Sequence, residues 1–411
     1  MKRLRAVLLA AAALLLPATP AHADPASISA AIAAAWTWLS SAAAAAAASF
    51  SLGEFLISVA VSVGLSYLAQ ALGGKPSGAP SGVSGTIQSG GIVPRSFIVG
   101  RYATAGSLVY TGTWGSDGDT PNAYYTQVIA LSDLPMTALQ EVWEGSTKGI
   151  YDPAQTAIAQ GRPIKEFTKD GRDNLWVIFH DGRQTVSDPF LNATFGADPD
   201  FPWHSTMVGV GVAHAIVTAR MNPQVFSGFP SYKFAGLGAA FYDQRADSSA
   251  GGSGTQRFDD QTTWAHTLNP IVIVNNILRG ISYAGQPLYG LEGMPASRLP
   301  SASWFAAMNE CDAFVEDLNG NDVAQYRCGA EIPVNVMPAD MIDSLNMSCN
   351  ARIAEIGGIY KILAGAAGAP GMSFFGDEIF VDQPQNAPQI PPIEGALQGA
   401  TATYLQPAAG W

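Results

Sequence analysis

Two carboxylates that flank an aromatic side chain are the residues of this sequence that most suggest catalysis. Glu141 and Glu144 lie on either side of Trp143. Glycoside hydrolases use a pair of carboxylates as acid and as base or nucleophile, and the separation of the two groups in space decides the chemistry. Sequence positions alone do not specify that separation. We therefore predict no catalytic residues, and we expect that the protein is not an enzyme.

The histidines do not follow a metal-binding pattern. Besides His22 near the N-terminus, the chain has His180, His204, His214 and His266, and no two stand four residues apart or within an HExxH motif. A zinc site therefore has little support. We predict that His180, before Asp181, lies at the edge of a turn, and that His214 is a hydrogen-bonded histidine of the core or of an interface.

Cys311, Cys328 and Cys349 are the three cysteines, and their spacing matches no zinc motif. An odd number excludes a framework in which every cysteine is paired within the chain. We predict that the three are buried as small apolar residues. One disulfide under oxidising conditions is the alternative.

Three further motifs resemble cofactor or metal sites only superficially. Residues 317–322 (DLNGND) lack the ligand spacing of a calcium loop and favour a hairpin turn. Residues 251–254 (GGSG) predict a flexible loop, because no GxSxG motif is present. Gly209 and Gly211 lack the strand-to-helix context of a dinucleotide site. We expect no metal and no cofactor.

Composition favours a protein of strands and turns. The 411 residues include 43 glycines and 27 prolines, more than helical bundles tolerate. Hydrophobic residues make up 48% and charged residues 13%, a balance that predicts a membrane segment, a stretch rich in small residues, or large subunit interfaces. The net charge of −12 argues against general binding of nucleic acid, which depends on Lys and Arg. We predict an α+β fold that is mainly β.

The N-terminal region has three parts with different patterns. Residues 1–23 resemble a signal peptide, with a basic start, an apolar stretch and an A-x-A site. Residues 24–72 are apolar and Ala-rich. Within them, residues 55–72 are uncharged and predict either a membrane-spanning helix or a helix buried between subunits. Residues 73–91 form a Gly/Ser/Pro linker.

A first β-rich domain is expected over residues 92–245. Its strands are indicated by β-branched and aromatic runs between turn residues, and residues 243–254 predict the next loop. Residues 181–182 (DG) predict a hairpin-type turn. The expected strands are residues 97–99, 107–114, 124–131, 174–180, 208–219 and 232–234.

A second α+β domain is expected over residues 246–380, followed by a Pro-rich tail, residues 381–411. Asn269 and Gly280 bracket a helix, Pro270–Arg279, as N-cap and C′ residue, although a strand there is the alternative. A second helix, capped by Ser301 or Ser303, would place four residues on one face: Trp304, Met308, Cys311 and Val315.

Further along this second domain, Asn319-Gly320 predicts a hairpin that leads into a strand over residues 323–328. A last helix places Met341, Ile342, Leu345 and Cys349 on one face. Gly357-Gly358 then joins two strands, Arg352–Ile356 and Ile359–Leu363.

Several separated motifs resemble one family. Residues 94–143 contain PRSF-x-VGRYATAGSLVY, a Gly/Asp turn, a PN dipeptide and TQVIALSDLP; later come WFAAMNECD, QYRCGAEI and GGIYKILAG. Together they resemble phage tail-tip hub proteins, the family of the tip attachment (host specificity) protein J of lambda-like phages, with relatives in prophages and gene transfer agents. The resemblance covers about residues 90–380.

This resemblance implies a homotrimeric ring that closes the tail tube and links it to host-recognition parts. The implied partners are the distal tail, tail assembly and tape-measure proteins, and the implied location is the virion tail tip, assembled in the bacterial cytoplasm. The signal-like residues 1–23 depart from the family, as does the end at Trp411, which suggests a truncated copy. The alternatives are a secreted or periplasmic β-rich binding protein, a surface protein anchored through residues 55–72, and a cell-wall-degrading enzyme.

Overall fold

The computed structural model describes residues 94–226, 228–291, 293–317 and 320–365. All of them belong to the compact unit Ser81–Trp411. The predictions for residues 1–23, 24–72, 73–91 and 381–411 lie outside the described residues. Among those described, no helix is both long and apolar enough to cross a membrane. Strands predominate and helices are few, which confirms an α+β fold that is mainly β.

The first antiparallel sheet has the strand order β2-β3-β8-β7-β6. Its long pair, β2 (Ser107–Asp117) and β3 (Thr120–Ser132), was expected from the β-branched and aromatic runs. β8 (Ala213–Arg220) pairs with both β3 and β7 (Leu175–His180), and β6 (Arg162–Pro163) completes the edge. The 3₁₀ helix η1 (Lys165–Phe167) lies between β6 and β7.

Two predictions about this sheet were wrong in detail. The strand predicted over residues 208–219 begins only at Ala213, because Val212 N–H bonds the carbonyl of Gly209 in a turn whose two glycines have positive φ. The turn at Asp181-Gly182 does not form a hairpin. The chain instead passes through α4 (Pro189–Phe195), capped by Asp188, before β8 returns to pair with β7.

The second sheet has the order β16-β1-β9-β4-β5. β1 (Ser96–Thr104) pairs through its first half with β16 (Gly329–Pro333) and through its second half with β9 (Tyr232–Leu237). The change of partner falls at Gly100, where φ is +62° and a Cβ would lie 2.0 Å from the carbonyl oxygen of Cys328. β9 also pairs with β4 (Ala138–Glu144), and β4 with β5 (Thr147–Ile150).

The two sheets share one hydrophobic core. Ile129 and Val177 from the first sheet pack with Ile98, Val142 and Phe234 from the second. α4 covers the other face of the first sheet through a separate cluster that includes Phe190, Phe195 and Trp203. Alternation along each strand directs side chains to opposite faces, so the strands of the first sheet contribute to both clusters.

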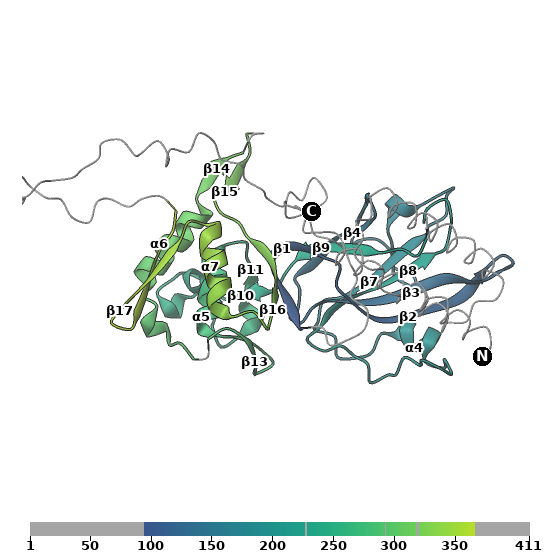
Figure 1. Cartoon of the computed structure of the whole chain (residues 1–411), viewed down its shortest axis with the longest axis horizontal. Coiled ribbons are helices and arrows are strands. Elements are labelled where there is room, and N and C mark those ends of the chain that lie inside the picture. The colour runs from purple at the N-terminus through teal and green to yellow at the C-terminus, as the bar shows by residue number, and fades with distance from the viewer. Residues whose placement is uncertain (1–93, 227, 292, 318–319, 366–411) are drawn as a thin grey trace, which may run out of the picture. The chain divides into compact units, whose positions relative to one another are not determined.

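The remaining helices pack around another core. α5 (Pro270–Arg279), α6 (Ser301–Asp312) and α7 (Pro338–Ser348) gather in the same part of the molecule in Figure 1. Phe97 and Val99 of β1 enter this core, so β1 contributes to both halves. The short strands are β10 (Ala240–Phe241), β11 (Ala265–His266), β12 (Ile281–Tyr283), β13 (Gln286–Tyr289), β14 (Phe314–Glu316), β15 (Asp322–Ala324), β17 (Arg352–Ile356) and β18 (Ile359–Leu363).

Several predicted elements of this half are confirmed. α5 has the predicted bounds, Asn269 caps it, and Gly280 follows with φ +89°. The hairpin β17–β18 also has the predicted bounds. The predicted loop over residues 243–254 contains two short 3₁₀ helices, η2 (Gln244–Ala246) and η3 (Ser248–Ala250). Two more 3₁₀ helices are η4 (Gln261–Thr263) and η5 (Ala296–Arg298).

The prediction for α6 was wrong at both ends. Neither Ser301 nor Ser303 caps it, since the N-cap is Pro300 and the Ser303 hydroxyl donates to the Pro300 carbonyl. The helix stops at Asp312, so Val315 lies in β14 and not on the helical face. The strand predicted over residues 323–328 ends at Ala324, because the next amides bond elsewhere: Gln325 N–H donates to the Ala313 carbonyl.

Candidate functional site

The structure separates the two carboxylates that flank Trp143. All three residues lie on β4, where alternate positions face opposite sides of the sheet, so Glu141 and Glu144 point away from each other. Glu141 is buried, with its carboxylate 2.9 Å from Arg101 Nη2 and 2.8 Å from Lys148 Nζ. It also accepts the Trp143 Nε1–H at 3.0 Å. Burial raises the pKa of Glu144.

Two of the histidines meet across the first sheet. His180 and His214 are register partners on β7 and β8, and their ring centroids lie 4.9 Å apart. His180 Nε2 lies 2.9 Å from Asp188 Oδ2, while His214 Nδ1 lies 3.0 Å from the Val212 carbonyl oxygen. Burial lowers the pKa of His214. His214 is therefore a hydrogen-bonded core histidine as predicted, but the sequence did not predict its contact with the His180 ring.

The other two histidines of the described ranges, His204 and His266, take no part in this pair. His204 is exposed, and His266 Nε2 lies 3.0 Å from the Gly100 carbonyl oxygen. Within the described ranges, no group of three or more His, Cys, Asp or Glu residues is arranged to hold a metal ion.

Two of the cysteines are buried neighbours in the helical core. Cys311 and Cys349 are fully buried, Cys328 is half-buried, and all three thiols are free. The hydrogen bond to Cys349 and burial raise the pKa of Cys311, and the same hydrogen bond lowers that of Cys349. Burial raises the pKa of Cys328 to about 12. The prediction of buried, apolar-like cysteines is confirmed for Cys311 and Cys349.

The motif that resembled a calcium loop forms a hairpin turn. The Asp317 carboxylate accepts the backbone N–H of Asn321 at 2.9 Å, which closes the turn between β14 and β15. This confirms the hairpin prediction. Gly251, with φ +90°, ends η3 in the loop that was predicted, and Gly209 and Gly211 form the turn before β8.

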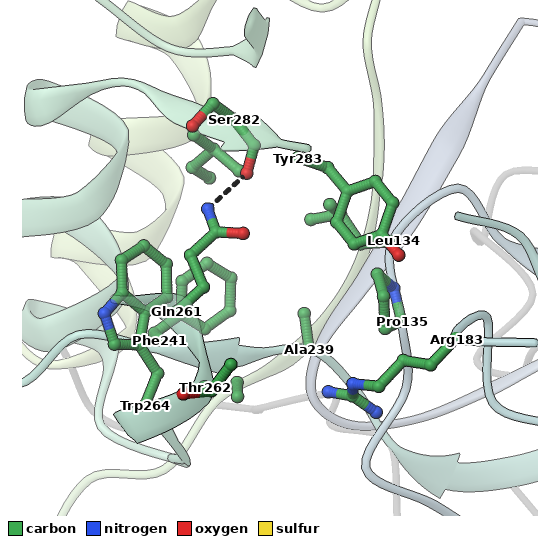
Figure 2. A pocket seen from close by; sticks show the side chains of 12 residues that line it. Leu134, Pro135, Arg183, Ala239, Phe241, Gln261, Thr262, Trp264, Ser282 and Tyr283 are labelled. Carbon is green, nitrogen blue, oxygen red and sulfur yellow. Dashed lines mark hydrogen bonds between the residues drawn. The ribbon is translucent and has the colours of Figure 1, made fainter. Parts of the chain in front are cut away.

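Polar and aromatic groups converge on a cavity of about 480 Å³. One side carries Gln261, Thr262 and Trp264, from η4 and the residues after it. The facing side carries Tyr283 of β12, together with Arg183 from the loop after β7. Figure 2 shows these side chains around one opening, with Ala239 between the two sides.

Hydrogen bonds fix the polar side chains of this cavity. Gln261 Nε2 donates to the Ser282 carbonyl at 2.7 Å, the bond drawn in Figure 2, and the amide oxygen points toward the Tyr283 side. Arg183 Nη1 donates to Asp181 Oδ2 at 2.7 Å, which holds the guanidinium at the opening.

The aromatic side chains of the cavity are also held in place. Trp264 Nε1 donates to the Arg257 carbonyl at 2.8 Å, and its ring lies beside those of Tyr242 and Phe258. Tyr283 packs on Gly211, where a Cβ would lie 2.9 Å from the ring. These two aromatic side chains are therefore in position before any ligand arrives, which lowers the entropic cost of binding.

Sequence reasoning did not find this cavity. Its residues come from five separated segments, near positions 134, 183, 240, 262 and 282. In the sequence, these residues are polar and aromatic side chains within loops, and most proteins have such residues in their loops. The tertiary structure brings them together, in part through the pairing of β10 with β11.

Comparisons with known proteins find a weak likeness in structure. No family model matches the chain, and no curated protein matches it. A solved structure described as the virion of a native gene transfer agent particle matches with a TM-score of 0.29 and 13% identity. The match covers 66% of this chain and 64% of that one. The likeness is to a phage-like virion particle.

Proposed function

We propose that this protein is a structural component of a phage-like tail: the central hub of the tail tip, which closes the tail tube and links it to host-recognition parts. The proposal rests first on the resemblance of residues 94–143 and of the later motifs to tail-tip hub proteins. Its partners would be further copies of itself, as a homotrimer, and the distal tail, tail assembly and tape-measure proteins. Its place would be the virion tail tip. No catalytic role belongs to this proposal.

The surface feature that carries the proposal is the outward face of the β17–β18 hairpin. In the pairing of β17 with β18, Arg352 lies opposite Leu363 and Ile356 lies opposite Ile359. These four residues share one face of the hairpin. Ile356 is 62% exposed and Leu363 61%. The exposed pair Ala354 and Lys361 lies between them on the same face, and we infer that a subunit interface covers the two apolar ends.

The opposite face of the same hairpin is firmly attached to the helical core. Ile362 is buried there, and Trp304 Nε1 of α6 donates to the Tyr360 carbonyl at 3.0 Å. An isolated two-stranded hairpin is marginally stable in water, so this packing holds the strands in place. The outward face is thus rigid, and both of its edges lack a third strand among the described residues.

Charge and edge structure agree with assembly into a ring. β2, an eleven-residue strand, forms one edge of the first sheet, and long open edges in a monomer invite pairing with another chain. A closed ring removes such edges, because each subunit covers its neighbour. The net charge of −12 would disfavour adhesion of the subunits to DNA that passes through the tube.

The test is the molar mass in solution, measured by light scattering. It is measured for the purified full chain and for a double variant, Ile356→Thr with Leu363→Thr. Threonine keeps the strand propensity and removes the apolar contact. We expect a trimer for the wild type and monomers for the variant. A matched control is Val186→Thr, at an exposed loop residue away from the hairpin, which should stay trimeric. A wild-type chain that is monomeric and does not associate with distal tail protein would refute the hub proposal.

A further inference from the structure

We propose that the cavity between Trp264 and Tyr283 is a saccharide-binding site for roughly one or two pyranose rings. Its volume of about 480 Å³ lies in the range of about 300–1,000 Å³ that is typical of small-molecule sites. The proposal is independent of the hub function, because it concerns a different surface from the β17–β18 hairpin.

The polar groups of the cavity match the hydroxyl groups of a sugar. The amide oxygen of Gln261 is an acceptor aimed at the opening, since its NH₂ group is oriented by the Ser282 carbonyl. Arg183 brings a guanidinium with five N–H donors, and its pair with Asp181 engages one nitrogen of that group. Adjacent hydroxyls both donate and accept, so they can satisfy an amide oxygen and a guanidinium together.

The apolar groups of the cavity match the C–H faces of a sugar ring. Tyr283 stands on one side, and Trp264 with the buried ring of Phe241 stands on the other. Aromatic side chains of this kind offer a flat apolar surface at a low entropic cost, because their ring positions are already fixed. A pyranose presents a flat patch of C–H groups on one face and hydroxyls around its rim.

Other ligand classes fit the same residues less well. A wholly apolar ligand would cover the Gln261 amide oxygen and the remaining N–H groups of Arg183 without hydrogen-bonding to them, and polar groups covered in this way cost binding free energy. A phosphate would meet one cation, Arg183, already neutralised by Asp181 at 2.7 Å. The observations therefore favour a neutral, hydroxyl-rich ligand with an apolar face.

The experiment uses the full chain and the methyl glycosides of glucose, galactose, mannose and N-acetylglucosamine, with inorganic phosphate as the competing ligand. Saturation-transfer NMR and tryptophan fluorescence report binding. We expect at least one glycoside to bind with a dissociation constant on the order of 1–10 mM, an affinity typical of a small polar ligand. Absence of binding by all four up to about 50 mM, or binding of phosphate alone, would overturn the proposal.

Three variants separate binding from stability. Gln261→Leu keeps the side-chain size and removes the acceptor, so it should weaken binding about tenfold, the effect of one lost hydrogen bond to a ligand hydroxyl. Arg183→Gln should weaken it several-fold. The matched control, Gln224→Leu, changes an exposed glutamine elsewhere and should bind as the wild type does. If Gln261→Leu and Arg183→Gln fold normally by circular dichroism and both bind unchanged, the site is assigned wrongly.

Discussion

Replacing Asn269 by alanine tests how the helical half of the protein is held together. The Asn269 side chain is 2% exposed, and its Oδ1 accepts the backbone N–H groups of Ile271 at 3.0 Å and Val272 at 3.3 Å. Its Nδ2 donates to the Met308 carbonyl of α6 at 2.8 Å. One side chain therefore caps α5 and also joins it to α6.

The expected loss of stability of α5 in Asn269→Ala has two parts. Removing a buried N-cap costs about 1–2 kcal/mol, because two helix N–H groups lose their acceptor. Losing the Met308 hydrogen bond adds about 0.5–1.5 kcal/mol. The total for Asn269→Ala is about 1.5–3.5 kcal/mol, which corresponds to an increase of roughly 10- to 300-fold in the opening equilibrium of α5. Asn269→Ser keeps a capping oxygen and loses only the Met308 bond, so it should change that equilibrium about 2- to 10-fold.

Native-state hydrogen exchange measured by mass spectrometry gives these changes in the opening equilibrium directly. It does not require the whole chain to unfold in one step. Peptides that cover Pro270–Arg279 should exchange faster in the order wild type, Ser variant, Ala variant. Peptides from β3, in the core between the two sheets, are the internal control and should be unchanged. Equal exchange in the Ser and Ala variants would refute a separate contribution from the cap.

Three further predictions concern buried polar groups. Glu141→Ala should lower the free energy of unfolding by about 2–4 kcal/mol, because it leaves the Trp143 N–H and two half-exposed cations without their acceptor. Glu141→Gln should lose clearly less in the same urea titration, and equal losses would contradict the reasoning. Burial lowers the pKa of His214 below its ordinary 6.5, so the folded state binds this proton less readily than the unfolded state. Stability should therefore fall as the pH drops below 6.5 toward the lowered pKa, and thermal melts of His214→Gln should show a weaker dependence between about pH 7.5 and 5. Because its pKa is raised, the Cys311 thiol should resist iodoacetamide in the native chain and react once urea unfolds it; rapid native labelling would be the contrary result.

Some elements could be predicted from the sequence because their signals lie within a few residues of one another. Asn269, Pro270 and Gly280 mark both ends of α5, and the structure confirms those bounds. The two glycines between β17 and β18 likewise determine that hairpin. The mainly β character of the first half follows from its β-branched and aromatic runs.

The end of α6 shows why a local pattern can mislead. The apolar spacing from Trp304 to Val315 continues for a turn beyond the helix. Tertiary contacts stop it, because the Cys311 carbonyl accepts Tyr326 N–H at 3.0 Å from the returning chain. A helical pattern describes which face could be buried, whereas the length of the helix depends on what competes for its last carbonyls.

The sequence by itself determined the strand-rich composition, the capped helix α5, the β14–β15 and β17–β18 hairpins and the burial of Cys311 and Cys349. Only the tertiary structure decided that β1 serves two partners and that His180 meets His214. It alone decided that Glu141 and Glu144 face apart, and that Gln261, Arg183 and Tyr283 surround one cavity. The physical reason is the range of the forces involved. Caps and turns depend on neighbouring backbone groups, while strand partners and cavities depend on burying apolar surface from distant parts of the chain at once.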